Sequence, residues 1–333
     1  MAIQYISPIK LNLEKNRPNV LLFGNGFFHE NMDWKSLLQR CAKDGIENNE
    51  FDELIKTDYL LFADAALDTS DSDRREKYIR QISQSDYVGE QAQELMGLLS
   101  EVPFDAVVTT NYTYQIERCI DSNFKPDTKN GYVHQIEKKS VKITKTENST
   151  DEHGRDAVRL LHTFNRVSND SGYVDVWHPH GELRRRSSLV LSHDEYGRLV
   201  RELVRYNDKR RRMRRSDGDV ELSSWFDYLL YGNVYILGFS ASYAEFDFWW
   251  LLNRRKREKD RSLIGKYYFY EPLSEANEAK RLLLSKMDVE FLNLDAVFTR
   301  KTKDYTMFYK KAIADICSKI NAERTKESSH EQK

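Results

Sequence analysis

Residues 19–26 read Asn-Val-Leu-Leu-Phe-Gly-Asn-Gly, an unbroken apolar run that ends in two closely spaced glycines. Short runs that are apolar throughout and stop at glycine are typical of strands buried on both faces in a parallel sheet. Three further runs, at residues 104–110, 174–177 and 234–237, have the same character and also end in small or polar residues. We therefore expect four neighbouring strands of one parallel sheet.

Helical patterns separate these strands. Trp34, Leu37 and Leu38 have the spacing of one helix face, and Ser242-x-x-Glu245 is the pattern of a capping box. Further helices are expected at residues 34–99 with a polar break at 69–73, near 116–120, at 198–215, after 242 and at 305–320. Strands that alternate with helices predict an α/β fold: a doubly wound, Rossmann-like parallel sheet with a helical insertion at about residues 30–100.

The remaining segments carry weaker signals. Residues 188–191, 267–270 and 289–292 are predicted to be additional strands, and residues 121–170 an irregular excursion. One domain is expected over residues 1–300, followed at 301–333 by a helix and a loose polar tail.

Composition limits the classes of function. The 333 residues contain 52 Lys and Arg against 53 Asp and Glu, so the net charge of -1 does not favour a polyanionic partner for the whole chain. The three cysteines, Cys41, Cys119 and Cys317, are too scattered for a disulfide framework or a cysteine-built zinc site. No signal peptide or membrane-spanning run is present, so a cytoplasmic location without membrane partners is predicted.

The strand ends are the best candidates for a binding site. Ligands of open parallel sheets bind beyond the carboxyl ends of the strands. Four such ends carry glycine or polar groups, which we expect on one rim: Gly24, Asn25 and Gly26; Thr110 and Asn111; His178 and His180; Gly238 and Ser240.

Each group has a chemical and a structural interpretation. The glycine loop could form a tight turn or bring backbone amides to a pyrophosphate. Asn111 could cap a helix or hold a sugar hydroxyl or water through its amide. His180 suits a general base, because an imidazole titrates near neutral pH, although a structural role and a metal pair with His178 are alternatives.

The segment after residue 238 offers a second set of polar groups. Ser240 and the helix that follows could contact a ribose or an anion. Asp247 could belong to that site or stabilise the helix dipole, whereas the dipole alone is sufficient to explain Glu245.

Taken together, these residues resemble the sirtuin-like NAD-consuming family, in its divergent bacterial branch. Residues 24–26 are similar to its Gly-Ala-Gly loop, residues 109–112 to its Thr-Thr-Asn-Tyr segment, His180 with Gly181 to its catalytic His-Gly, and residues 238–240 to its Gly-x-Ser. The resemblance covers about residues 18–255. Phe27 stands where the family has serine, and Thr113 where it has an acid.

The resemblance implies NAD as substrate, with His180 and Asn111 catalytic and with Gly24, Asn25, Gly26, Thr110, Gly238, Ser240 and Asp247 binding it. Because the four-cysteine zinc site of deacylating sirtuins is missing, the expected reaction is hydrolysis of NAD without zinc. Members of this branch act as antiphage effectors that deplete NAD, as oligomers and sometimes with an activating partner protein.

Three alternatives remain open. The chain could sense NAD or ADP-ribose without consuming it. It could bind nucleic acid through the basic stretch at residues 198–215, where Arg211 and Arg212 lie. It could also be a metal-dependent hydrolase that uses His178 and His180.

Overall fold

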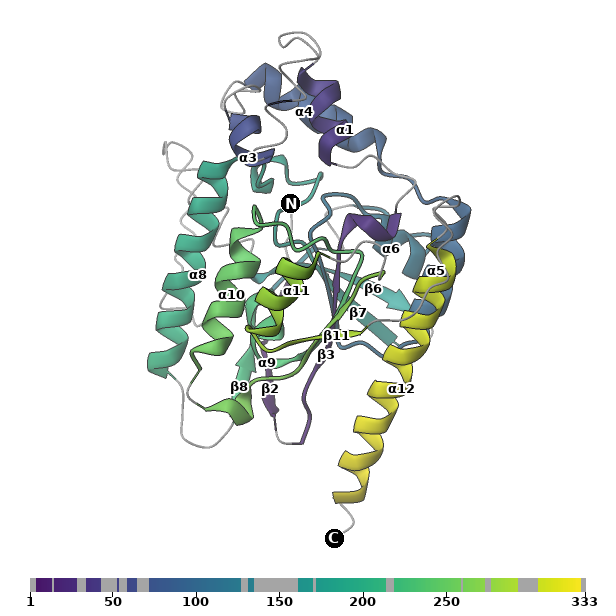
Figure 1. Cartoon of the computed structure of the whole chain (residues 1–333), viewed down its shortest axis with the longest axis vertical. Coiled ribbons are helices and arrows are strands. Elements are labelled where there is room, and N and C mark those ends of the chain that lie inside the picture. The colour runs from purple at the N-terminus through teal and green to yellow at the C-terminus, as the bar shows by residue number, and fades with distance from the viewer. Residues whose placement is uncertain are drawn as a thin grey trace.

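One nine-stranded sheet organises the computed structural model of the chain, in the order β1-β5-β6-β7-β4-β3-β9-β10-β11 (Figure 1). The structure describes residues 4–13, 15–28, 34–42, 53, 59–64, 72–126, 131–134, 161–169, 172–213, 219–258, 260–272, 277–292 and 305–330. The strands are β1 (Gln4–Ile6), β3 (Asn19–Phe23), β4 (Ala106–Thr109), β5 (Gly131–His134), β6 (Thr163–Asn169), β7 (Gly172–Trp177), β9 (Asn233–Leu237), β10 (Tyr267–Tyr270) and β11 (Val289–Leu292). A separate antiparallel pair joins β2 (Ile9–Asn12) to β8 (Asp219–Leu222).

The strands from β7 through β4, β3, β9 and β10 to β11 are all parallel. β3 lies in the middle of this group, and all of its residues are buried. Val20 and Leu22 join one hydrophobic cluster, whereas Leu21 and Phe23 join another. Because both faces of the sheet are covered, the strand has no solvent face and is apolar throughout.

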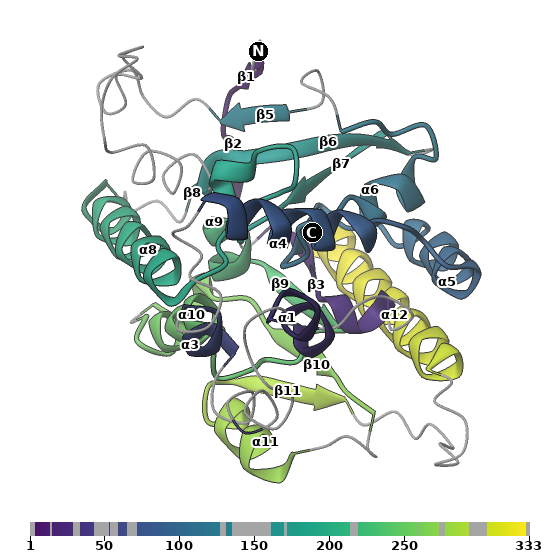
Figure 2. The same ribbon diagram turned by 90° about the horizontal axis from the view of Figure 1, so that it is seen from above.

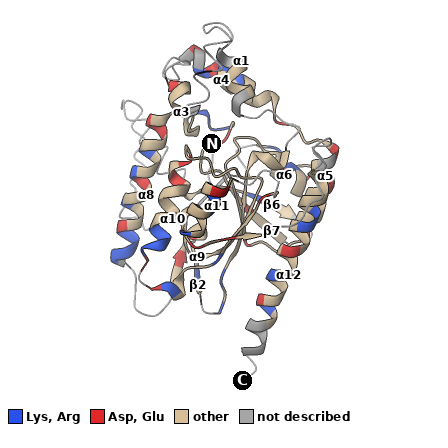
Figure 3. Cartoon of the chain, viewed as in Figure 1, with Lys and Arg blue, Asp and Glu red and all other residues tan. Residues whose placement is uncertain are grey.

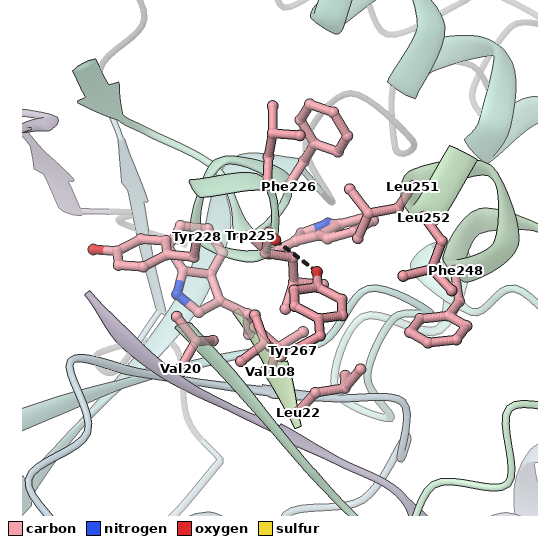
Figure 4. Close-up of a cluster of buried hydrophobic side chains, with 14 of the residues drawn as sticks. Val20, Leu22, Val108, Trp225, Phe226, Tyr228, Phe248, Leu251, Leu252 and Tyr267 are labelled. Atoms are coloured by element: carbon pink, nitrogen blue, oxygen red, sulfur yellow. Dashed lines mark hydrogen bonds between the residues drawn. The ribbon is translucent and has the colours of Figure 1, made fainter. Parts of the chain in front are cut away.

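Helices cover the two faces in separate layers, as Figure 2 shows. One face carries α8 (His193–Met213), α9 (Trp225–Tyr231), α10 (Phe246–Lys256) and α11 (Glu278–Ser285), and the other carries α5 (Glu90–Ser100), α6 (Gln115–Ile120) and α12 (Thr306–His330). On the first face, aromatic residues of α9 pack between Val20, Val108 and the apolar side of α10 (Figure 4). The predicted α/β, doubly wound fold is confirmed.

The helical insertion forms a third hydrophobic cluster. α1 (Trp34–Ala42), α3 (Tyr59–Phe62) and α4 (Ser72–Gln84) lie at one end of the molecule, at the top of Figure 1. Leu38, Phe62 and Tyr78 pack there with Leu189 and Leu191. The segment that follows β7 is therefore covered by the insertion.

The prediction of a strand at residues 188–191 is wrong. The short 3-10 helix η3 (Arg186–Ser188) ends there, and the next residues form no strand among the described residues. The amide of Val190 donates to the carbonyl of His180, 2.8 Å away, while Leu189 and Leu191 are buried beneath the insertion. Burial under helices thus explains an apolar run that resembles a strand.

Two other predictions need correction. β5 and β6 lie within residues 121–170, where we expected irregular structure, and β6 pairs with β7 through Arg166 and Asp175, whose nearest atoms are 2.7 Å apart. Residues 127–130, 135–160 and 170 of that excursion lie outside the described residues. The polar tail is also helical as far as His330, because α12 continues through good helix formers and Glu323 accepts a bond from Asn233 Nδ2 at 2.7 Å.

The described helices include none that is both long enough and apolar enough to cross a bilayer.

Arg255 on α10 provides a test of how the layers are held together. Its guanidinium is buried and donates to the carbonyls of Leu229, Leu230 and Gly265 at 3.2, 3.1 and 2.5 Å. Arg255→Ala removes a donor from each of these carbonyls, and among the described residues only that of Leu229 keeps a second one, the hydroxyl of Tyr267, at 2.6 Å. We therefore expect a loss of about 3 kcal/mol in the free energy of unfolding. Arg257→Ala, on the exposed end of the same helix, is the control and should change that energy by less than ~0.5 kcal/mol in urea unfolding. Equal effects of the two variants would contradict this account.

Candidate functional site

A cavity of about 620 Å³ lies at the carboxyl ends of the parallel strands. It is lined by residues that follow β3, β4, β7, β9 and β10, and by parts of the insertion, α8 and α12. Eight of the nine predicted site residues line it: Gly24, Asn25, Gly26, Thr110, Asn111, His180, Gly238 and Ser240. The ninth, Asp247, lies behind His180 and bonds to it. Segments far apart in the sequence thus meet at one rim.

The floor of the cavity is a contact between two glycine loops. The amides of Gly24 and Gly26 donate to the carbonyls of Leu237 and Gly238, at 3.0 and 2.8 Å. A Cβ on Gly24 would lie 2.4 Å from the Gly238 oxygen, and Gly238 itself has a φ of 62°. The glycines are therefore required for close approach of the two loops, and these two amides are not available to a pyrophosphate, contrary to one interpretation of the sequence.

Asn111 presents an unpaired amide to the cavity. The residue is 8 % exposed, and among the described residues its Nδ2 atom has no hydrogen-bond partner. The helix α6 begins only at Gln115, after the cap residue Tyr114, so Asn111 is not its N-cap. A buried amide without a partner is costly, and this orphan is best explained by a ligand that accepts from it.

His178 belongs to a buried network beside the cavity. Its Nδ1 bonds the carbonyl of Asn111 at 2.8 Å, and its Nε2 bonds Glu117 Oε1, also at 2.8 Å. Asn165 Nδ2 donates to both Glu117 and Glu182. Burial lowers the pKa of His178, but the attraction of Glu117 outweighs it and the pKa is raised above its ordinary value. His178 thus holds the backbone of Asn111, and it does not pair with His180 around a common ligand.

His180 faces a different set of groups. Its Nε2 lies 3.0 Å from Asp247 Oδ2, and its Nδ1 lies 3.2 Å from the hydroxyl of Tyr196. An ionised carboxylate only accepts hydrogen bonds, so Asp247 places a proton on Nε2 and leaves Nδ1 as the position that gains or loses one. Burial lowers the pKa of His180, but Asp247 and Glu245 raise it by more, so the net shift is upward.

Glu245, like Tyr196, is a cavity residue that sequence reasoning missed. We expected it to serve as the acid of a capping box, but α10 begins at Phe246 and has no side-chain cap. Its Oε2 accepts from the Tyr196 hydroxyl at 3.2 Å and lies 3.7 Å from His180 Nε2. Burial, opposed by His180 and assisted by Asp247, raises the pKa of Glu245 to about 7. The Ser-x-x-Glu pattern gave a sufficient local explanation and so concealed this contact.

One further residue could have been predicted from its position directly after a strand, since ligands bind beyond the carboxyl ends of parallel strands. Glu271 directly follows β10, lines the cavity and is buried, with Oε1 accepting from Lys280 Nζ at 2.6 Å. Lys280 also donates to the carbonyl of Ser240 at 3.0 Å. α12 completes the wall, where the hydroxyl of Tyr309 donates to the Gly26 carbonyl at 3.0 Å.

A metal-ligating geometry is present, although not the predicted one. Ligand atoms of His180, Glu245 and Asp247 lie within 4.8 Å of one another, which makes them the group among the described residues that could hold an ion. The ring nitrogens of His178 are both engaged elsewhere. Cys119 and Cys317 are free thiols.

The predicted basic helix lies outside the cavity. α8 covers residues up to Met213, whereas Arg214 and Arg215 fall outside the described residues. Its cations gather with those of α10 at one end of the helix pair (Figure 3). Arg211 and Arg212 are exposed there, roughly 20 Å along the axis from Tyr196 at ~1.5 Å per residue. Binding of nucleic acid at this surface stays a prediction.

Comparison with known families adds an independent observation. A family model for the SIR2-like domain matches residues 105–292, which is more than half of the chain. The matched range runs from the start of β4 to the end of β11 and includes Asn111, His180, Gly238 and Asp247. A comparison with curated proteins found no match.

The glycine floor makes a prediction about stability. Gly238→Ala places a Cβ 2.5 Å from the backbone nitrogen of Phe27 in a left-handed conformation, so we expect it to cost about 1–3 kcal/mol in the free energy of unfolding. The matched control is Gly97→Ala in α5, where nothing lies within 4 Å of the new Cβ. There we expect a gain of about 0.5–1 kcal/mol. Thermal unfolding of both variants measures the difference, and a neutral Gly238→Ala would disprove the close contact.

Proposed function

The chain belongs to the SIR2-like family, and from that premise we propose that it hydrolyses NAD to nicotinamide and ADP-ribose. The observation that carries the proposal is the unpaired, buried amide of Asn111, in a cavity that His180 also lines. SIR2-like domains are typical of proteins that use NAD. A cavity of about 620 Å³ lies within the range of about 300–1,000 Å³ common for small-molecule sites.

The bond to be broken joins nicotinamide to the anomeric carbon of a ribose. Nicotinamide leaves as a neutral molecule from a cationic ring, so the leaving group needs little help from an acid. The transition state resembles an oxocarbenium ion, as in other glycoside cleavages. The task for the protein is to exclude bulk water, hold the ribose and deliver one water molecule to the anomeric carbon.

His180 and Asn111 suit these tasks. We assign to His180 the acceptance of a proton from a ribose hydroxyl or from the attacking water, with Asp247 fixing its tautomer at 3.0 Å. The amide of Asn111 holds that hydroxyl or water, and its backbone is in turn held by His178 at 2.8 Å. A positioned base of this kind contributes roughly 10²–10⁴-fold to a rate.

The remaining predicted residues serve binding. Asn25, Thr110 and Ser240 line the cavity, and we assign their polar groups to the dinucleotide. The glycines at positions 24, 26 and 238 keep the floor low enough to admit it, since a side chain there would meet the facing backbone.

The biological role that we propose follows the resemblance to antiphage effectors that deplete NAD. Oligomer formation and an activating partner protein are part of this proposal. The reaction itself uses residues of one chain, all of which line the cavity or contact His180.

Nicotinamide release from NAD tests the proposal. Purified protein, with a chelator present, should release nicotinamide, and His180→Ala or Asn111→Ala should lower kcat by about 10²–10⁴-fold. His180→Gln, which keeps a hydrogen-bonding side chain, guards against loss of folding in the alanine variant. Thr325→Ala on α12, outside the cavity lining, is the control and should retain wild-type turnover.

The same assay separates the competing functions. Saturable NAD binding without nicotinamide release would favour a sensor of NAD or ADP-ribose. Turnover that the chelator abolishes would favour a second candidate, a metal-dependent hydrolase, which is supported by the grouping of His180, Glu245 and Asp247.

A further inference from the structure

Both ring nitrogens of His180 are engaged by the protein. Asp247 bonds Nε2 at 3.0 Å, and the Tyr196 hydroxyl lies 3.2 Å from Nδ1. A proton from the substrate can therefore pass to the imidazole through one of these two partners. Tyr196 lines the cavity, whereas Asp247 does not.

The hydroxyl of Tyr196 also contacts a second acid, Glu245. The hydroxyl lies 3.2 Å from Glu245 Oε2, and the Glu245 side chain lines the cavity and is 13 % exposed. Nδ1 of His180, the hydroxyl of Tyr196 and the carboxylate of Glu245 thus form an unbroken chain of three proton-exchanging groups. Each end of this chain, an imidazole and a carboxylate, is a group that can accept and release a proton.

We propose that Tyr196 and Glu245 complete a proton relay with His180, in which Tyr196 admits the proton of the reacting hydroxyl and Glu245 returns it to the cavity. This inference rests on the proposed function, because it describes how the hydrolase would be reset after each turnover.

The relay balances in two steps. First, the reacting O–H bond breaks, its proton binds the Tyr196 oxygen, and the proton of Tyr196 moves to His180 Nδ1, leaving imidazolium. Second, Nδ1–H returns a proton to the Tyr196 oxygen while the Tyr196 proton moves to Glu245, which becomes neutral. Glu245 then releases the proton to water in the cavity. One proton leaves for each NAD hydrolysed, as the overall reaction requires.

The charges around this chain decide its pH dependence. Burial and the carboxylates of Glu245 and Asp247 raise the pKa of Tyr196 well above its ordinary value, so the phenol transmits a proton and does not remain ionised. Besides His180, three titratable groups among the described residues face Tyr196: Tyr112 from the segment after β4, Glu245 and Asp247. Arg75 of α4 and Glu195 of α8 act in turn on Tyr112.

The experiment combines turnover with a direct view of the imidazole. In protein carrying ¹⁵N-labelled histidine, the Nδ1 signal of His180 is assigned by its loss in His180→Gln and followed against pH. Glu245→Gln removes a negative neighbour, so we expect the midpoint of this titration to fall. Tyr196→Phe should lower kcat for nicotinamide release at least tenfold with a smaller change in KM, because it interrupts transfer and not binding.

Two matched controls come from the same helix as Tyr196. The hydroxyl of Tyr206 donates to the buried carboxylate of Asp227 at 2.6 Å, but Tyr206 does not line the cavity, so Tyr206→Phe should leave kcat and the His180 titration unchanged. Glu202→Gln removes a buried acid that pairs with Arg205 at 2.8 Å, also outside the cavity lining.

The outcomes separate the relay from the hydrolase. Wild-type kcat and an unshifted pH profile in both Tyr196→Phe and Glu245→Gln would overturn the relay. A midpoint of the His180 titration that is the same in Glu245→Gln as in the wild type would also overturn the relay, whether or not the protein releases nicotinamide. A titration that responds to Glu245 in a protein without nicotinamide release would uphold the coupled chain and reject hydrolysis of NAD as its use.

Discussion

The backbone contact between the two glycine loops is the constraint on which the rest of the site depends. Gly24 and Gly26 donate to the carbonyls of Leu237 and Gly238, at 3.0 and 2.8 Å, at the ends of two adjacent parallel strands. Any side chain at these positions would meet backbone, which cannot move aside as a flexible side chain can. Close approach lowers the floor of the cavity and also sets the path of the chain into α10. The position of Asp247 behind His180 follows from that path.

The two histidines after β7 show how environment divides the roles of identical side chains. Both are buried, and the carboxylates around each raise its pKa, but their surroundings differ. His178 bonds only buried groups, Glu117 and the Asn111 carbonyl, and so serves as a support for Asn111. His180 has one fixed partner, Asp247, and one partner on the cavity wall, Tyr196. Only the second arrangement can exchange a proton with a ligand.

Much of the fold could be predicted because its signals are local. The buried strands β3, β4, β7 and β9 are apolar runs with glycine or polar residues at their ends. Because the carboxyl ends of parallel strands lie at one edge of the sheet, the sequence is sufficient to predict that these residues share one rim. The strands β5 and β6 were missed because their support is not local: β6 depends on pairing with β7, including the contact between Arg166 and Asp175. The prediction of a strand at residues 188–191 was wrong because helices of the insertion bury these apolar residues, which pair with no strand among the described residues.

The same distinction explains what could be predicted of the site. Asn111 and His180 directly follow parallel strands, so their positions in the sequence are sufficient to predict that they lie on the rim. Tyr196 and Glu245 lie on or before helices, and nothing in their local sequence indicates that the start of α8 lies beside the start of α10. Their contact with His180 exists only because both helices pack on the same face of the sheet, with Leu199 and Phe248 in one hydrophobic cluster. Proton-exchanging chains that depend on such packing require the fold before they can be found, whereas the groups at strand ends require only its topology.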